Sequence, residues 1–275
     1  MRRNQNSRYV TLTIAAAIWA LPLVAMLVFS FAPNSEILKM SLWPSSFTIE
    51  NYFEVLTTDI RGVSIPSSLI NSVIILGVQV VGILLLDVPA AYIFARVSFP
   101  GREILFWSIL VTMMMPGLID LISLYDLMSN IGLIDTLPGI FLPGLARPIG
   151  IFLLRQFFRQ IPKEFEEAAR LDGATDFQIF SRIMVPLAIP AITTLGIITA
   201  LYSWNNFLWP LVASNTPSSM PVPIAMAYLQ QGTSPAQNYS VMLAAAVVTS
   251  LPMIIVFLIA QRWIVRGIQP ASGIK

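Results

Sequence analysis

The longest stretch without a charged residue constrains this chain more than any other feature. It runs from Ile183 to Gln261 and contains no Asp, Glu, Lys or Arg. The stretch is too long for one helix, and its middle, residues 213–239, is rich in Ser, Pro, Asn and Gln. It therefore predicts two membrane spans joined by a polar loop. The whole chain of 275 residues is 56% hydrophobic and only 11% charged, which excludes an ordinary soluble domain.

Six apolar segments are long enough to cross a bilayer as helices. A helix rises about 1.5 Å per residue and the hydrocarbon core is about 30 Å thick, so about 20 residues are needed. The third segment is expected to break at Met115-Pro116-Gly117, and the fourth carries Arg147 and Pro148 near its start. The fold class is therefore a single all-α transmembrane domain, 1–275. Its predicted spans are 10–31, 68–94, 104–127, 138–158, 184–212 and 240–264.

The positions of Lys and Arg predict the orientation, because cytoplasmic loops carry an excess of them. With the N-terminus inside, 13 of the 16 basic residues are cytoplasmic, and only Lys39, Arg61 and Arg147 lie outside. Both termini are then cytoplasmic. The loop 162–183 faces the cytoplasm and the loop 213–239 is external.

The composition also excludes several kinds of site. There is no cysteine and no histidine, so disulfides, thiolate or imidazole metal sites and a Ser-His-Asp triad are all excluded. No G-x-x-x-x-G-K-[ST] loop is present, so this chain does not bind ATP through one. A net charge of +2 is too small to imply nucleic acid. We predict no catalytic residue and no metal site.

A charged island, Pro162–Pro190, interrupts the apolar sequence. Three glutamates lie near the start of its first predicted helix, where the helix dipole favours acids. Gly173 can adopt the left-handed conformation that ends a helix. Thr175 and Gln178 have the spacing of a capping box, so a second helix can begin at once. The pattern predicts two short helices with a glycine elbow, which form a rigid knob rather than a flexible linker.

The alternative is an amphipathic connection that lies on lipid. Surface-seeking helices are usually basic on their polar face, whereas the first helix here has three glutamates against Lys163 and Arg170. The spacing favours another interpretation, because it resembles the EAA motif of ABC-importer permeases, EAA-x3-G-x9-I-x-L-P. The chain matches this motif at Glu167, Ala168, Ala169, Gly173, Ile183 and Pro186, with Val185 where leucine is usual.

In such permeases this loop is a coupling helix that docks in a groove of a cytoplasmic ATPase. The resemblance therefore implies a set of ATPase-coupling residues in this chain: Glu167, Ala168, Ala169, Asp172, Gly173, Phe177 and Phe180. The segment 269–275 also resembles a C-terminal segment that contacts the ATPases in the family. Pro270 and Ser272 depart from its usual glycine-rich ending.

The resemblance covers the chain from Asn51 onward and is closest to the shorter of the two permeases in maltose-type, carbohydrate-uptake importers. It implies the six-helix type I ABC-importer fold in a bacterial inner (plasma) membrane. The implied partners are a second permease in a heterodimer, two ATPases that bind ATP and Mg, and an extracytoplasmic solute-binding protein. No cofactor is implied in this chain, which would not itself be an enzyme. The residues that carry the resemblance are Asn71-Ser72, Ala90-Ala91-Tyr92, Ala95-Arg96, Phe99-Pro100-Gly101-Arg102, Trp204-Asn205-Asn206-Phe207, Trp209-Pro210-Leu211 and 261–267.

Trp204, Asn205 and Asn206 place an indole beside two amides at membrane depth. Amides are costly there unless they face protein or a water-filled path. They could line a sugar path, because amides bond hydroxyls and an aromatic face stacks on a pyranose ring. The alternative is that these amides join packed helices. Both stay open, because in maltose-type importers the partner permease holds most substrate contacts.

The external loop 213–239 includes Ser218, Ser219, Met220 and Pro221. In maltose-type permeases the equivalent loop reaches into the binding protein and helps to displace sugar, so the resemblance implies that contact here. A plain connector is the alternative, although connections between helices are usually far shorter.

Asp87 is an isolated carboxylate inside the second span, nine residues before Arg96. That spacing places it about 13 Å above the inner boundary. The family usually has a small or apolar residue here, so the resemblance assigns it no role. A carboxylate at this depth is a functional hypothesis by default. We favour a structural pair or a hydrogen bond across the subunit interface over substrate contact, since Pro89 bends the helix and makes room for a partner.

Two other classes of protein compete with the importer permease. An ion-coupled secondary transporter usually carries intramembrane charges and often inverted repeats, whereas Asp87 is isolated and no repeat is visible. An intramembrane enzyme needs a nucleophile with a base, or a metal cluster. The solute is left open among sugars, amino sugars and glycerol phosphate esters. The uncharged fifth and sixth spans favour a neutral one.

Overall fold

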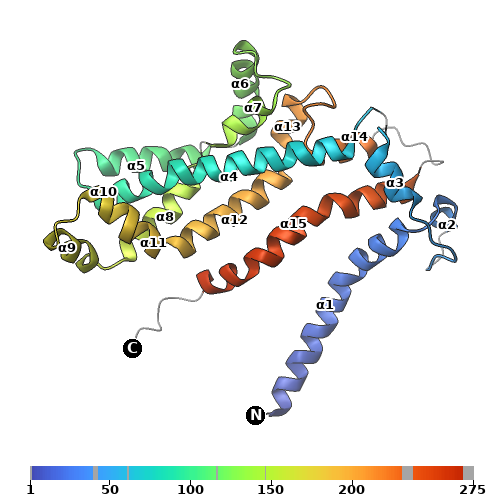
Figure 1. The fold of residues 1–275 in the computed structure, drawn as a ribbon, viewed down its shortest axis with the longest axis horizontal. Helices are drawn as coiled ribbons and strands as arrows, with labels where there is room; N and C mark the ends of the chain where they lie inside the picture. Colours follow the sequence, from blue (N-terminus) through green and yellow to red (C-terminus); the bar gives the residue numbers. More distant parts are fainter. Residues whose placement is uncertain are drawn as a thin grey trace.

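The computed structural model describes residues 2–39, 43–60, 62–115, 117–145, 147–230 and 238–268. Over these ranges the regular secondary structure is helical, apart from one isolated β-bridge between Ile60 and Val63 (Figure 1). The helices are α1 Arg2–Ser30, α2 Asn34–Leu38, α3 Glu50–Thr57, α4 Ile65–Arg96, α5 Arg102–Val111, η1 Thr112–Met114, α6 Gly117–Asn130, α7 Leu137–Phe141, η2 Leu142–Leu145, α8 Pro148–Gln160, α9 Glu164–Leu171, α10 Asp176–Ile179, the π-helical η3 Phe180–Met184, α11 Val185–Leu187, α12 Ile189–Asn205, α13 Leu208–Ala213, α14 Val222–Gln230 and α15 Tyr239–Ile268.

Four helical segments among the described residues are long and apolar enough to cross a membrane: Tyr9–Ser30, Ile65–Arg96, Leu137–Gln160 and Tyr239–Ile259. Two further pairs pass the same test together, but each is bent at a short break. Arg102–Met114 meets Ile119–Asn130 at 102°, and Asp176–Leu187 meets Ile189–Asn205 at 71°. The all-α membrane class is confirmed. Among the described residues the candidate spans number four, or six when each bent pair counts as one.

The third predicted span breaks where Met115-Pro116-Gly117 indicated, because proline cannot donate the next helical hydrogen bond. Other boundaries differ from the prediction. The second span begins at Ile65, since Pro66 fits the first turn of a helix. The fifth keeps only Ile189–Asn205 as one straight helix. The predicted loop 213–239 contains the helix α14, and its residues 231–237 lie outside the described ranges.

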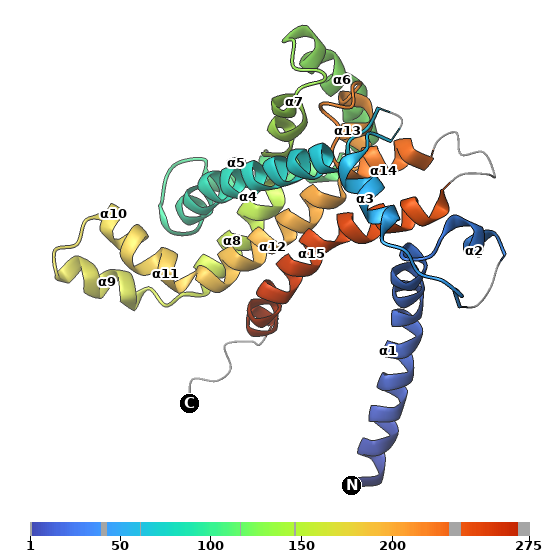
Figure 2. The same cartoon turned by 45° about the vertical axis from the view of Figure 1, so that its right-hand side comes forward.

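The core forms where α4, α8 and α12 lie side by side (Figures 1 and 2). Ile83 and Tyr92 of α4, Leu154 and Phe158 of α8, and Leu195 of α12 are all buried in one apolar cluster. Two smaller clusters lie farther along α4, one with α14 and α15 and one with α7 and α13. The long α4 therefore connects the three apolar clusters that the described residues form.

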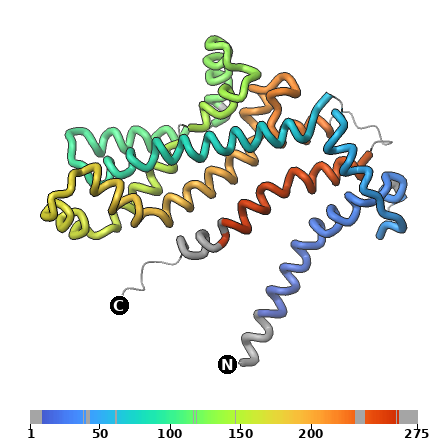
Figure 3. The backbone as a smooth tube through the Cα atoms, in the orientation of Figure 1, coloured from blue at the N-terminus to red at the C-terminus, as the bar shows by residue number. Residues whose placement is uncertain are grey.

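The two ends of α4 carry different structures, as the tube in Figure 3 shows. α9 and α10 lie at its C-terminal end, whereas α3 and α14 lie at its N-terminal end. α1 stands apart from the core, and its membrane-length segment, Tyr9–Ser30, is buried against the rest of the chain only at its C-terminal end, where Ser30 is 0% exposed. It meets α15 near the N-terminal end of α4. An open flank of this kind suits contact with lipid or with another subunit.

Candidate functional site

The charged island folds as two short helices around an elbow, as its sequence predicted. We call residues 164–179, which comprise α9, the elbow and α10, the α9–α10 knob. Gly173 has a φ of +81°. Thr175 caps α10 through a complete capping box with Gln178. Arg170 and Asp176 close the elbow with an ion pair of 2.6 Å between Nη2 and Oδ1. The local hydrogen bonds thus fix the angle between the two helices.

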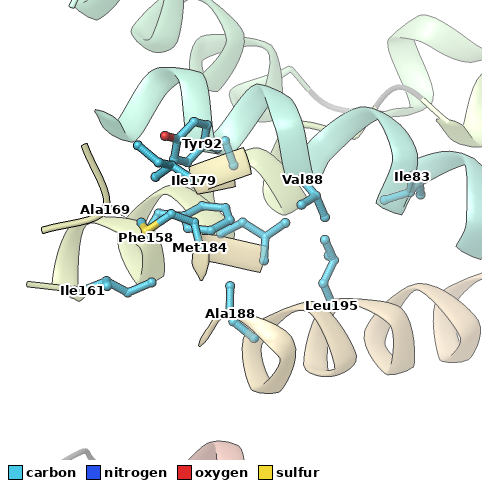
Figure 4. Packing of buried hydrophobic residues seen from close by; sticks show 13 residues of the cluster. Ile83, Val88, Tyr92, Phe158, Ile161, Ala169, Ile179, Met184, Ala188 and Leu195 are labelled. Carbon is cyan, nitrogen blue, oxygen red and sulfur yellow. The ribbon is translucent and has the colours of Figure 1, made fainter. Parts of the chain in front are cut away.

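Buried side chains fasten the knob to the helical core (Figure 4). Ala169 of α9 and Ile179 of α10 belong to the same buried cluster as Tyr92 of α4 and Phe158 of α8. The rings of Tyr92 and Phe158 meet edge to face, with 5.8 Å between their centroids. Because interiors are close-packed and transmit strain, a force on the knob reaches α4 and α8 directly.

A buried ion pair adds a polar fastening between α9 and α4. Arg96, at the C-terminal end of α4, has its Nε 3.1 Å from Oε1 of Glu166, and both side chains are largely buried. Nη2 of Arg96 also donates hydrogen bonds to the carbonyl oxygens of Phe158, at 2.5 Å, and of Ile161. The Arg96 guanidinium therefore connects α4 both to α9 and to the C-terminal end of α8.

The opposite face of the knob is open to solvent. Phe177 is 74% exposed and Leu171 is 90% exposed, which is unusual for large apolar side chains next to a charged surface. Of the predicted coupling residues, Glu167, Ala168, Asp172, Gly173 and Phe177 are exposed. The other two predicted residues, Ala169 and Phe180, face the core, and Phe180 contacts the Tyr92 ring with 5.0 Å between centroids. Sequence reasoning missed Leu171, although an apolar residue just before the elbow glycine was visible.

Asp87 is 3% exposed within its own chain. It packs against Gly150 of α8, where an added Cβ would collide with the Asp87 carboxylate. Its Oδ2 has no hydrogen-bond partner among the described residues, and Arg147 lies within electrostatic range. Both predicted roles of Asp87, a structural pair and a hydrogen bond across a subunit interface, stay predictions, because no hydrogen-bond partner of Oδ2 lies among the described residues.

Two polar side chains of α4 hold the segment before α14 in place. Nδ2 of Asn71 donates to the carbonyl oxygens of Ser218, at 2.8 Å, and Met220, at 3.1 Å. Oγ of Ser72 accepts from the amide of Val222 at 2.8 Å. Among the four predicted binding-protein residues, Ser218 is exposed, whereas Ser219, Met220 and Pro221 are buried.

Asp135 fixes the same segment from the loop between α6 and α7. Its Oδ1 accepts from the amides of Asn215, at 2.8 Å, and Thr216, at 2.9 Å, and from the Ser219 hydroxyl at 2.5 Å. Burial alone would raise the pKa of Asp135, but the hydrogen bonds from Ser219, Thr216 and Asn215 outweigh it and lower the pKa to about 2. The carboxylate therefore stays ionised and holds the segment.

Replacing Asp135 by asparagine should loosen this segment. A hydrogen bond contributes about 1 kcal/mol, so the Asn215 and Thr216 amides should exchange hydrogen about fivefold faster than in the unsubstituted chain. Since the folded-state pKa is lowered, the protection is present above the ordinary pKa of 3.8 and is lost as the pH falls toward about 2. Hydrogen exchange followed by mass spectrometry, with α7 amides as the internal reference, measures both effects. Equal exchange in the two chains would contradict the assignment.

The predicted substrate-path residues fall into two groups. Asn206 lines a cavity of about 510 Å³ together with Asp120, Arg147, Tyr202 and Trp209. Trp204 and Asn205 instead line a separate groove beside α15, with Leu201, Ser250, Met253, Ile254 and Phe257. The structure thus brings only one of the three into the cavity. Sequence reasoning placed Arg147 in an external position and singled out neither Tyr202 nor Asp120.

The chain matches known transport proteins over most of its length. The family model described as "Binding-protein-dependent transport system inner membrane component" matches residues 87–270. The chain is 34% identical over 264 residues to the arabinooligosaccharides transport system permease protein AraQ of Halalkalibacterium halodurans, covering 94% of this chain and 92% of that protein. It is 35% identical over 260 residues to the trehalose transport system permease protein SugB of Mycobacterium tuberculosis, covering 94% and 93%.

A solved structure agrees with these sequence matches. A chain of a bacterial ABC transporter involved in the import of the acidic polysaccharide alginate superposes with a TM-score of 0.82 at 26% identity, covering 95% of this chain and 96% of that chain. The chain therefore belongs to the family of binding-protein-dependent transport system inner membrane components, as a membrane-spanning permease subunit of an ABC importer.

Proposed function

We propose that the α9–α10 knob couples this permease to a cytoplasmic ATPase. The proposal rests on the difference between the two sides of the knob, of which one is buried and the other is exposed. One side is fastened to α4 and α8 by Ala169, Ile179 and the Arg96–Glu166 pair. The other exposes Phe177 and Leu171. A short rigid element with an apolar exposed face suits insertion into a hydrophobic groove of a partner.

The proposed assembly contains four membrane-associated chains. This subunit pairs with a second, homologous permease, and two ATPase subunits that bind ATP and Mg lie below them. The proposed topology has six spans, with each bent pair counted as one, so that both termini and the knob lie in the cytoplasm; the excess of Lys and Arg predicted on that side supports it. A predicted ATPase contact of residues 269–275 lies outside the described residues.

The proposed external partner is a solute-binding protein that contacts the segment around Ser218. A related structure, with a TM-score of 0.66 at 15% identity, is that of an alginate ABC transporter in complex with an alginate pentasaccharide-bound periplasmic protein. Among the four predicted contact residues, Ser218 is the one on the surface. Ser219, Met220 and Pro221 would support that contact from beneath by holding the segment in place.

The proposed solute is a sugar or a sugar-like molecule. The relatives are named for arabinooligosaccharides, trehalose and sn-glycerol-3-phosphate. In the proposed cycle, closure of the ATPase pair moves the knob, and the clusters around α4, α8 and α12 carry that movement to the opposite end of the chain. The ATPases supply the energy, and this chain converts their movement into opening of half of the translocation path.

The subunit composition tests the proposal. The chain is tagged at its N-terminus, extracted with a mild detergent and weighed intact by native mass spectrometry. We expect a complex with a second permease and two ATPase subunits. A stable monomer or homo-oligomer without ATPase would contradict the coupling role and would favour an ion-coupled secondary transporter.

Replacing Phe177 by alanine should weaken ATPase retention. Truncating an interface anchor costs at least about 1 kcal/mol, so retention should fall about fivefold or more. The measurement is the amount of ATPase that remains with the tagged chain over a dilution series. Phe47→Ala is the matched control, because Phe47 is also exposed, at 58%, but precedes α3 at the other end of α4. Equal losses in both variants would argue against a specific contact.

A further inference from the structure

Three helix breaks in different parts of the chain converge on the cavity that contains Asn206. Irregular backbone at membrane depth is tolerated only where it is buried in protein or lines a water-filled cavity. In many transporters, discontinuous helices build the solute site. The lining residues at the breaks are Gly117 after η1, Pro143, Gly144 and Arg147 before α8, and Asn206 and Leu208 between α12 and α13. The cavity is about 510 Å³, within the range of small-molecule sites.

Arg147 presents unused hydrogen-bond donors to this cavity. Its guanidinium carbon lies 3.3 Å from the centroid of the Tyr202 ring, so the ring holds the guanidinium flat. In the described parts of the chain, none of the side-chain hydrogen bonds or ion pairs uses this guanidinium. Because guanidinium donors lie in the plane of the group, they point away from the ring and are left for a ligand.

An acceptor of opposite charge lies on another wall of the same cavity. Asp120, in the first turn of α6, is exposed, and no ion pair within 4.0 Å joins it to Arg147 among the described residues. The amide of Asn206 adds a donor and an acceptor. Nε1 of Trp209 donates to the Gly139 carbonyl at 3.0 Å, which fixes the indole in the wall. The cavity thus combines one cation, one anion, an amide and two aromatic rings.

We propose that this cavity is a solute site within this one chain, and that it takes a neutral polyhydroxylated molecule such as a sugar. Arg147, Asp120 and Asn206 bond hydroxyl groups, while Tyr202 and Trp209 contact the apolar faces of the sugar ring. Asp87 lies within electrostatic range of Arg147 and Asp120 lines the cavity itself, so a phosphate or carboxylate solute would meet a carboxylate without gaining a free cation. This inference rests on the proposed import function and names the class of solute that the translocation path carries.

The chain contains no cysteine, so one introduced thiol can report on the occupancy of the cavity. Leu124→Cys places a thiol in the cavity wall, and Met253→Cys places one in the separate groove beside α15. The purified complex is treated with a thiol reagent in the presence of trehalose, an arabino-oligosaccharide or sn-glycerol 3-phosphate. At a sugar concentration ten times its Kd, modification in the cavity should slow about tenfold. Modification in the groove should not change.

Variants that remove one charge each, at Arg147 or at Asp120, test which residues select the solute. Arg147→Gln should weaken protection by the neutral sugars about tenfold, and Arg147→Lys, which keeps the charge, should restore it only in part. Asp120→Asn removes a carboxylate that lines the cavity and would repel an anion, so protection by sn-glycerol 3-phosphate should appear or increase. A purely structural role for either residue would not exchange one solute class for the other. Asp120 is on the surface, so this variant remains informative if an Arg147 variant fails to assemble.

Each outcome has a defined meaning. Protection by a neutral sugar in the cavity alone, lost in Arg147→Gln, supports the site. If sn-glycerol 3-phosphate protects Leu124→Cys as well as the neutral sugars do, or better, with Arg147 and Asp120 unchanged, the proposal of a neutral solute is wrong. If no probe protects Leu124→Cys while the same sample contains both ATPase subunits, the site is wrong and the coupling function stands. If the ATPases are missing from the complex, the coupling function is wrong whatever the thiol reports.

Discussion

Replacing Gly173 by valine is expected to release the ATPase from this subunit. Gly173 has a φ of +81°, where a β-branched residue is strained. Holding valine in that conformation costs about 1–3 kcal/mol, and the elbow relaxes by changing the angle between α9 and α10. The exposed face of the knob then no longer fits the groove of the ATPase. We expect ATPase retention to weaken about 10- to 100-fold, measured by co-purification over a dilution series.

Two controls separate the elbow from general instability. Gly173→Asn should retain much of the binding, because asparagine tolerates the left-handed conformation better than other residues do. Gly132→Val introduces the same strain at another glycine, with φ +70° in the turn between α6 and α7. It should lower stability without affecting the ATPase. Full ATPase retention in Gly173→Val would show that the elbow does not set the docking geometry.

The features of the knob could be predicted because their causes are local. A left-handed glycine, a capping box and acids in the first turn of a helix each depend on residues within a few positions of one another. Gly173 and the Thr175–Gln178 box accordingly appear in the structure as their spacing predicted. The all-α membrane class likewise follows from the length of apolar segments, which needs no knowledge of packing.

The cavity could not be predicted in the same way, because it depends on which faces meet. Hydropathy marks an apolar segment but not the direction in which it leaves a break, so the 102° bend before Ile119 was not foreseeable. The excess of basic residues predicts a side of the membrane for Arg147 but not its neighbours, because the rule treats each charge as part of a loop. In the structure it lines a cavity with Tyr202, a residue 55 positions later. Trp204 and Asn205, adjacent to Asn206 in sequence, face a different groove, since successive residues of a helix point about 100° apart.

Replacing Arg96 by methionine should uncouple ATP hydrolysis from solute uptake. Arg96 is the buried partner of Glu166, with 3.1 Å between Nε and Oε1, and it also bonds two carbonyl oxygens at the end of α8. Removing one partner of a buried ion pair costs about 3–5 kcal/mol, so the fastened position of α9 loses most of its population. The ATPase should still bind the exposed face of the knob. Uptake should fall more than tenfold while ATP hydrolysis continues, and α9 amides should exchange hydrogen faster.

The double variant Arg96→Met with Glu166→Met shows whether the loss of uptake comes from the Glu166 carboxylate, which Arg96→Met leaves buried and unpaired. Replacing both partners of a buried pair by apolar residues is often nearly neutral, so uptake should recover in part. It should not recover fully, because two carbonyl oxygens still lack the guanidinium donor. Lys163→Met is the matched control, since Lys163 is exposed beside α9. If the double variant is as inactive as Arg96→Met, the fastening acts through the carbonyl bonds rather than through Glu166, and the path of force runs from α9 by way of α8.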